Sequence, residues 1–211
     1  MSEFLTLSAL SIVAVGFFVG IVVGLTGMGG GALMTPALIL LGFADATSVV
    51  TADLTAAAVY KTGGAAMHAR HGAPNLKLAG WLITGSVPMA FIAPFVFHHL
   101  VGEGEQLQTS LKLAIGIALL FAAATYAFRL YLQLRAVHRG EHRHDDNPVI
   151  RPIPTMLVGA LGGGLVGITS VGSGSVIMIA MLMLYPGLSA LRLVGTDLVQ
   201  AVPLVLAAAV S

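Results

Sequence analysis

The sequence predicts an all-α fold: a polytopic membrane helix bundle built from two internal repeats with glycine-broken first helices. Three observations favour this fold. First, 57% of the 211 residues are hydrophobic and only 9% are charged, whereas a soluble domain draws about a quarter of its residues from Asp, Glu, Lys and Arg. Second, apolar runs long enough to cross a bilayer recur along the chain. Third, one glycine pattern occurs twice.

Six apolar regions are long enough to cross a bilayer, which takes about 20 helical residues. The second, third, fourth and sixth have the length of one crossing. The first and fifth are too long for one straight crossing and are interrupted by glycines, so each is predicted to be a broken helix. The six regions are residues 5–41, 46–66, 78–100, 111–132, 153–185 and 188–210.

The basic residues predict the orientation of the loops, because short cytoplasmic loops are enriched in Lys and Arg. Three basic residues, beginning with Lys61, lie within 61–77, and five lie within 129–152. Residues 101–110 contain two glutamates and no Lys or Arg. We therefore expect loops 61–77 and 129–152 to be cytoplasmic and loop 101–110 to lie outside.

The glycine pattern predicts two fused copies of one membrane unit, an arrangement typical of transporters. Its glycines recur every four residues on one helix face, which favours close helix packing. The first repeat is expected to span 1–135, with about four membrane regions, and an incomplete second repeat to span 153–211. A His- and Arg-rich cytoplasmic linker, 136–152, joins them. The alignment pairs Gly16, Gly20 and Gly24 with Gly159, Gly163 and Gly167, and Asp53 with Asp197.

Two questions about the repeats stay open. The copies lie parallel if four crossings separate them, and inverted if one region is a hairpin. The second copy also lacks counterparts for about two membrane regions of the first. We therefore expect either a fragment or a shortened protein whose second half another subunit completes, so a homo-oligomer is one expectation.

The break in each copy is a predicted anion-binding site. Glycines that unwind a membrane helix leave backbone N–H groups free, and the N-terminus of the following half-helix favours negative charge. The second copy replaces several glycines with hydroxyl side chains, which suit an oxyanion. The alternative is a hinge or a tight packing point. The candidate substrate-binding residues are Thr26, Gly29, Gly30, Gly31, Thr169, Ser170, Ser173 and Ser175.

Asp53 and Asp197 are the candidate proton-coupling residues. Each lies roughly nine residues into its region, near the middle of the bilayer. A charge at that depth costs at least about 2.5 kcal/mol, so the carboxyl should face the protein interior or take up a proton. The alternative is a structural role, in which each aspartate caps a half-helix or hydrogen-bonds to the opposite glycine loop.

Several function classes are excluded by the composition. The chain has no cysteine, which excludes thiolate catalysis and thiolate-held metal clusters. Its net charge of +1 does not indicate the strongly basic surface that binds nucleic acid. No histidine lies in the interior of a predicted span, since His98 and His99 end the third region, which argues against an intramembrane hydrolase. The linker histidines His138, His142 and His144 are interpreted as solvated, so we expect no enzyme, no cofactor and no metal site.

Three segments carry a resemblance to a known family. They are Gly24-Leu-Thr-Gly-Met-Gly-Gly-Gly-Ala-Leu-Met-Thr-Pro-Ala-Leu38, Gly167-Ile-Thr-Ser-Val-Gly-Ser-Gly-Ser175 and Gly195-Thr-Asp-Leu-Val199. In these segments the chain resembles the TauE/SafE sulfite exporter family, also called the toluene sulfonate uptake permease family. The resemblance covers nearly the whole chain, although the second segment is serine-substituted and lacks a counterpart of Pro36.

The resemblance implies a multi-pass permease of a prokaryotic inner (plasma) membrane that moves sulfite or small organosulfonate anions, often outward. The residues by themselves support a duplicated membrane carrier with an anion-binding break. We therefore expect a secondary transporter, embedded in the lipid bilayer, that exports such an anion coupled to protons. Two alternatives stay open: a channel or cation carrier that uses Asp53 and Asp197 as ligands, and a non-transporting truncated subunit.

Overall fold

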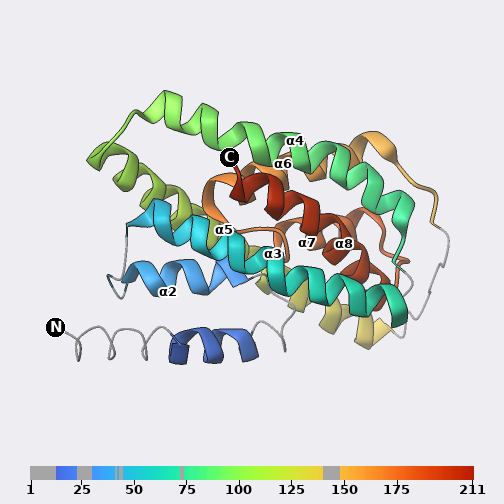
Figure 1. Ribbon diagram of the computed structural model, residues 1–211. Helices are drawn as coiled ribbons and strands as arrows, with labels where there is room; N and C mark the ends of the chain where they lie inside the picture. Colours follow the sequence, from blue (N-terminus) through green and yellow to red (C-terminus); the bar gives the residue numbers. More distant parts are fainter. Residues whose placement is uncertain (1–12, 23–29, 41, 43–44, 72–73, 140–147) are drawn as a thin grey trace.

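The computed structural model describes residues 13–22, 30–40, 42, 45–71, 74–139 and 148–211. Within these residues every regular element is a helix (Figure 1), which confirms the predicted all-α fold. A helix at Val13–Val22 comes first. The others are η1 (Gly30–Ala32), α2 (Met34–Leu40), α3 (Ala46–His71), α4 (Leu76–Val101), α5 (Glu105–Arg139), α6 (Pro152–Thr169), α7 (Val176–Leu184) and α8 (Ala190–Ala209).

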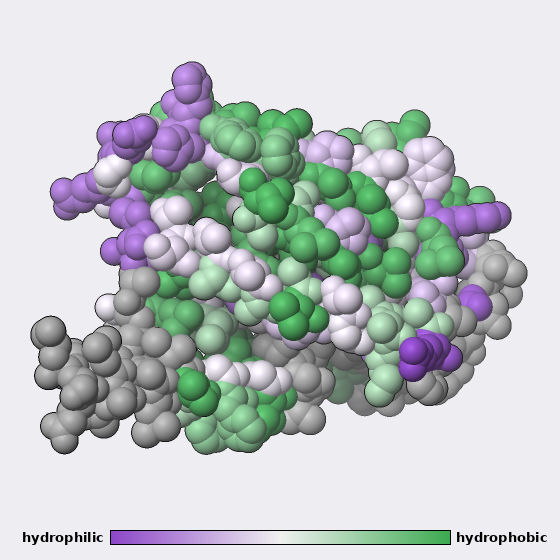
Figure 2. All heavy atoms as spheres, viewed as in Figure 1, coloured by the Kyte–Doolittle hydropathy of each residue, from purple (hydrophilic) through white to green (hydrophobic). Residues whose placement is uncertain are grey.

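Among the described residues, four helical segments are long and apolar enough to cross a membrane: Leu76–Val101, Glu105–Phe128, Pro152–Thr169 and Leu191–Ala209. Large apolar side chains on them face outward; Leu120, for example, is 74% exposed. Figure 2 shows strongly hydrophilic residues gathered at the two ends of the bundle, with mostly apolar or neutral residues between them. Such a surface fits a bundle surrounded by lipid.

Helix α3 corrects the predicted position of Lys61. The sequence placed this residue at the start of a cytoplasmic loop, but α3 continues through it to His71. No proline occurs between the start of α3 at Ala46 and Pro74, and the pair Gly63 and Gly64 does not end the helix. Lys61 is therefore a helical residue on the buried side of α3, only 3% exposed.

Helix α5 corrects the second predicted cytoplasmic loop. It extends to Arg139, so residues 129–139 are helical and the expected linker starts inside a helix. Pro152 occupies the first turn of α6, a position that suits proline because its missing N–H has no partner there anyway. His142 and His144 lie outside the described residues.

The fifth predicted region is broken, and its second half turns back. Helix α6 ends at Thr169, where Ser170 adopts the left-handed conformation with φ 58°. Ile177, near the start of α7, lies against Gly162 of α6. The Tyr185 hydroxyl, just after α7, accepts a hydrogen bond of 2.9 Å from the Arg151 N–H at the start of α6. Helices α6 and α7 thus form an antiparallel hairpin.

Glycines of α6 allow this hairpin to pack directly against the backbone of α4. A Cβ atom on Gly159 would lie 2.5 Å from the Leu82 carbonyl oxygen, and one on Gly167 would lie 2.5 Å from that of Ala90. The two backbones can pack this closely only because both positions are glycine. Since Ala90 lies well inside α4, the turn after α6 lies within the membrane-spanning part of the bundle.

Helices α3 and α8, which the glycine alignment pairs, run in opposite directions. Gly64 of α3 lies beside Leu198 of α8, and His68, one turn further along α3, lies beside Gly195, which comes earlier in α8. The same alignment pairs Met34, at the start of α2, with Ile177, at the start of α7. Met34 packs on Gly16 as Ile177 packs on Gly162. The duplication stays a prediction, but these directions are those of inverted copies.

The two ends of the bundle carry different segments. One end, called the Arg151 end, brings 74–77, 148–150 and Arg192 around one cavity of about 720 Å³. The opposite end, called the His98 end, brings Thr47, His98 and Ser211 around another. Residues 74–77 and 148–150, which belong to the two loops expected to be cytoplasmic, therefore lie at one common end.

Candidate functional site

The Asp53 carboxylate lies at the centre of the candidate site and connects the two breaks. Its Oδ2 accepts a hydrogen bond of 2.5 Å from the Ser170 hydroxyl and one of 3.2 Å from the Thr35 hydroxyl. Ser170 begins the turn after α6, and Thr35 belongs to α2, which follows the first break. Asp53 itself lies on α3 and is 3% exposed. A single buried oxygen atom therefore holds both breaks against α3.

Gly30 and Gly31 allow the two breaks to touch. A Cβ atom on Gly31 would clash with the carbonyl group of Ser170, and one on Gly30 would lie 2.8 Å from the Tyr60 hydroxyl. The Gly30 N–H donates a hydrogen bond of 2.9 Å to that hydroxyl. The expectation that this N–H is free for an anion is therefore wrong, because a side chain of α3 already uses it.

Lys61 joins the same cluster, two helical turns after Asp53 on α3. Its ammonium donates a hydrogen bond to the Ser173 hydroxyl in the turn between α6 and α7. It also interacts electrostatically with the carboxylates of Asp53 and Asp197. The sequence contains a signal for this role, because Asp53, Ala57 and Lys61 recur every four residues on one helix face. Sequence reasoning missed it by reading the charge as a loop marker.

Asp197 approaches Lys61 from α8. The residue is 5% exposed, and its Oδ1 accepts a hydrogen bond of 3.0 Å from the Gln200 amide one turn later. The side-chain oxygen Oε1 of Gln200 in turn accepts a hydrogen bond of 3.2 Å from the Ser86 hydroxyl of α4. Helices α3, α4 and α8 thus fix two carboxylates around one ammonium.

The hydroxyls of the second break have different partners. Thr169 donates to the Leu165 carbonyl at 2.7 Å and accepts from the Val171 N–H, so its hydroxyl serves the end of α6. Ser170 is held by Asp53 and Ser173 by Lys61.

The Ser175 hydroxyl differs from these three. The residue is 4% exposed, and its hydroxyl is the single buried side-chain N or O atom without a hydrogen-bond partner among the described residues. Thr26 and Gly29, the other two predicted binding residues, lie outside the described residues.

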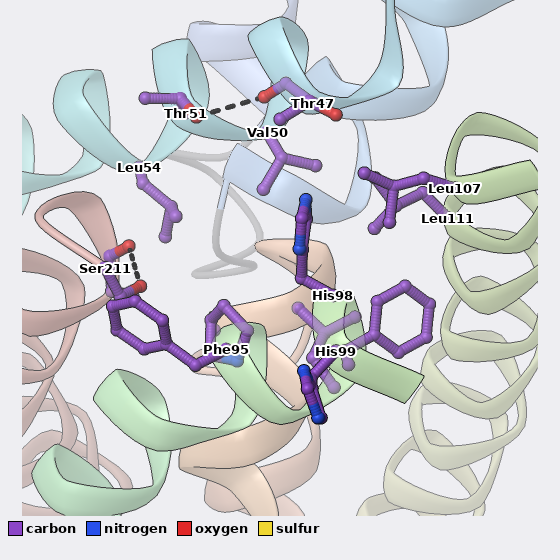
Figure 3. A pocket seen from close by; sticks show the side chains of 15 residues that line it. Thr47, Val50, Thr51, Leu54, Phe95, His98, His99, Leu107, Leu111 and Ser211 are labelled. Atoms are coloured by element: carbon purple, nitrogen blue, oxygen red, sulfur yellow. Dashed lines mark hydrogen bonds between the residues drawn. The ribbon is translucent and has the colours of Figure 1, made fainter. Parts of the chain in front are cut away.

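A cavity of about 680 Å³ lies at the His98 end, and Figure 3 shows the side chains that line it. Side chains of α3, α4 and α5 are among them, including Thr47 and Phe95. The lining also includes Leu54, which follows Asp53, and Ile168, which lies two residues before Ser170. Close sequence neighbours of two residues of the buried polar cluster therefore line this cavity.

Comparison with known proteins agrees with this architecture. Residues 12–211 match the family described as "Sulfite exporter TauE/SafE". The "Probable membrane transporter protein YjnA" of Bacillus subtilis (strain 168) is 37% identical over 203 residues, which cover 96% of this chain and 78% of that protein. No solved structure matches the chain. The chain belongs to the sulfite exporter TauE/SafE family and is a multi-pass membrane transporter.

Proposed function

We propose that the protein is a secondary transporter that exports sulfite or a related small organosulfonate anion and couples this movement to protons. The family description names sulfite export. The observation that carries the proposal is the buried Ser175 hydroxyl, which has no partner among the described residues. A buried hydroxyl without a partner is unfavourable, by about 1–3 kcal/mol. Such a group is well placed to bind a ligand that arrives during transport.

The turn that contains Ser175 has the chemistry to bind an oxyanion. Sulfite and sulfonates present oxygen atoms that accept hydrogen bonds, and serine hydroxyls donate them. Ser173 and Ser175 lie two residues apart in this turn, and the nine-residue helix α7 begins directly after it. The N-terminus of a helix favours negative charge. An anion bound here would meet hydroxyl donors and a favourable helix dipole together.

Asp53 and Asp197 supply the proton-coupling part of the proposal. Both carboxylates are buried inside the bundle, where a permanent charge is costly to move. A carboxyl that takes up a proton in one part of the cycle avoids that cost. Both groups also lie close enough to Lys61 to interact with it electrostatically, so their protonation changes the charge next to the serine turn.

A cation carrier is the main alternative, since two buried carboxylates could also bind a cation. The buried ammonium of Lys61 opposes it, because the ammonium already interacts with both carboxylates and would repel a second cation. Ion competition separates the two classes. Sulfite should displace bound methanesulfonate, whereas a cation carrier would respond to sodium or potassium instead.

The test is transport by the purified protein in lipid vesicles. Radiolabelled sulfite flux is measured with and without a pH gradient, for the wild type, for Asp197→Asn and for the matched control Asp45→Asn at an exposed position. We expect flux that depends on the gradient in the wild type and the control, and that loses this dependence in Asp197→Asn. Absence of sulfite flux, or wild-type flux indifferent to the gradient, would contradict the proposal.

A further inference from the structure

Lys61 is a charged residue that is buried inside the bundle, where an ammonium is unfavourable. Its side chain is 3% exposed, on a helix in the middle of the bundle. Removing an ammonium from water costs several kcal/mol, which its neighbours must offset. A neutral side chain of similar volume would avoid this cost entirely. The presence of the ammonium therefore calls for a role that a neutral side chain cannot perform.

We propose that Lys61 binds the transported anion directly and supplies the positive charge that holds it. This inference rests on the proposed function and adds the residue that would select anions. The ammonium has three N–H donors, and its hydrogen bond to the Ser173 hydroxyl uses one of them. The unpartnered hydroxyl of Ser175 lies in the same turn. An oxyanion between Lys61 and Ser175 would satisfy both groups at once.

The charges around Lys61 then fix how protons accompany the anion. With Asp53 and Asp197 ionised, these two carboxylates and the ammonium together carry one net negative charge, which repels an anion. One proton on either carboxylate makes the cluster neutral and leaves the ammonium available. Within the part of the chain that the structure describes, the other titratable groups near the cluster are the hydroxyls of Tyr60 on α3 and Tyr126 on α5, which bond to the backbone of Gly30 and Gly174.

This charge balance implies that one proton enters with each anion. Because one proton would be linked to one anion, the affinity for the anion should rise by up to about tenfold for each unit by which the pH falls, over the range in which the carboxylate titrates. Proton and anion would therefore move in the same direction across the membrane. Lys61 is the residue that connects the two, since it is shared between the carboxylates and the anion.

The chain offers a chemical test because it contains no cysteine. Lys61→Cys introduces a single thiol, which 2-bromoethylamine converts into a side chain that resembles lysine and carries the same charge. Iodoacetamide converts the same thiol into a neutral side chain. We expect Lys61→Cys to lose at least about tenfold in sulfite flux, aminoethylation to restore most of it, and carbamidomethylation to restore none. Lys112→Cys, an exposed position on α5, is the matched control and should keep its flux throughout.

Protection of a thiol gives a readout that does not depend on transport. Methanesulfonate, an organosulfonate that does not react with thiols, should slow alkylation of Ile168→Cys, a variant that keeps Lys61 and carries its thiol in the lining of the cavity, more strongly at low pH than at high pH. It should not slow alkylation of Ile168→Cys when Lys61→Met is added. It should not slow alkylation of Lys112→Cys. If Lys61→Cys does not insert, Lys61→Arg keeps the charge and should retain flux with an altered KM, whereas Lys61→Met should lose flux.

The outcomes separate this inference from the proposed function. Wild-type flux combined with an unchanged KM in Lys61→Cys, or equal rescue by the charged and the neutral reagent, would overturn the role of Lys61 alone. Absence of wild-type flux would overturn the proposed function, and the protection assay would still decide about Lys61. Equal protection of Ile168→Cys by methanesulfonate in the presence of Lys61 and of Lys61→Met would show that Lys61 does not bind the anion.

Discussion

The Ser170 hydroxyl donates a hydrogen bond of 2.5 Å to the Asp53 carboxylate, although the two residues lie 117 positions apart in the sequence. Ser170 begins the turn of the α6 and α7 hairpin, while Asp53 lies on α3, so the bond joins the two halves of the chain. The same carboxylate oxygen accepts from Thr35 of α2. This geometry makes Asp53 a structural anchor as well as a candidate for proton coupling, and the two roles can be separated by substitution.

Ser170→Ala should destabilise the protein by about 1.5–3 kcal/mol, the usual range for a hydrogen bond to a charged group. The loss arises because the buried carboxylate of Asp53 keeps only Thr35 as a hydroxyl donor. Thermal unfolding in detergent measures it. Thr55→Val is the control, since Thr55 is exposed on the same helix and its hydroxyl bonds only to its own helix, at the Thr51 carbonyl. Equal melting temperatures for Ser170→Ala and the wild type would show that the bond contributes nothing.

Gly159→Ala should destabilise the contact between α4 and α6 by about 1–3 kcal/mol, the usual cost of overpacking. The added methyl would lie 2.5 Å from the Leu82 carbonyl oxygen, and neither backbone can easily move. Gly116→Ala on α5 is the matched control, because its Cβ would meet nothing within 4 Å. Alanine is the better helix former, so the control should keep or gain stability, by up to about 1 kcal/mol. Equal effects of the two substitutions would contradict the close packing.

The sequence predicted these glycines better than it predicted the site. Regular spacing of small residues marks a packing face, and the structure confirms that face for Gly159, Gly163 and Gly167. The two aspartates and the serine turn were also identified, because polar residues inside apolar regions stand out. Their assembly around one cluster depends on contacts between α3, the α6 and α7 hairpin, and α8, and no local pattern encodes those contacts.

Lys61 shows why other parts of the site were not predicted from the sequence. A lysine near the end of an apolar region normally marks a cytoplasmic loop, and only the three-dimensional structure shows that α3 continues for ten residues beyond it. The reversal of α7 escaped for a similar reason. Glycine predicts that a helix breaks, but the direction of the next segment depends on partners such as Tyr185 and Arg151.

Ser175→Ala should keep or raise stability and weaken transport. The hydroxyl has no partner among the described residues, so its removal takes away no hydrogen bond of the free protein. If the hydroxyl binds the substrate, its loss should raise KM by about tenfold, which corresponds to about 1.4 kcal/mol of binding free energy. Sulfite flux and the melting temperature are measured on the same preparation. Normal flux from a normally stable variant would remove Ser175 from the binding site.

Asp45 should give the protein an acid-sensitive contribution to stability. It precedes α3 and accepts hydrogen bonds from the Ser48 hydroxyl at 2.7 Å and the Ser48 N–H at 3.1 Å. These bonds hold the pKa of Asp45 below its usual value of 3.8. Because the folded state favours the ionised carboxyl, the contribution is complete above the usual pKa and disappears as the pH falls through the lowered one. The difference in melting temperature between the wild type and Asp45→Ala should therefore be constant above about pH 5 and shrink below about pH 4. A difference that does not change with pH would show that the charge is irrelevant.

Ile168→Cys should report which side of the membrane the His98 end faces. Ile168 lines the cavity at the His98 end, so its thiol should be accessible from that end. Lys77, Arg151 and Arg192 lie at the Arg151 end, which we expect to be cytoplasmic. A membrane-impermeant maleimide should therefore label Ile168→Cys in right-side-out vesicles and not in inverted ones. Leu82→Cys, at a position that is 0% exposed, should stay unlabelled in both. Labelling of Ile168→Cys in inverted vesicles alone would reverse the orientation and place the entrance of this cavity in the cytoplasm.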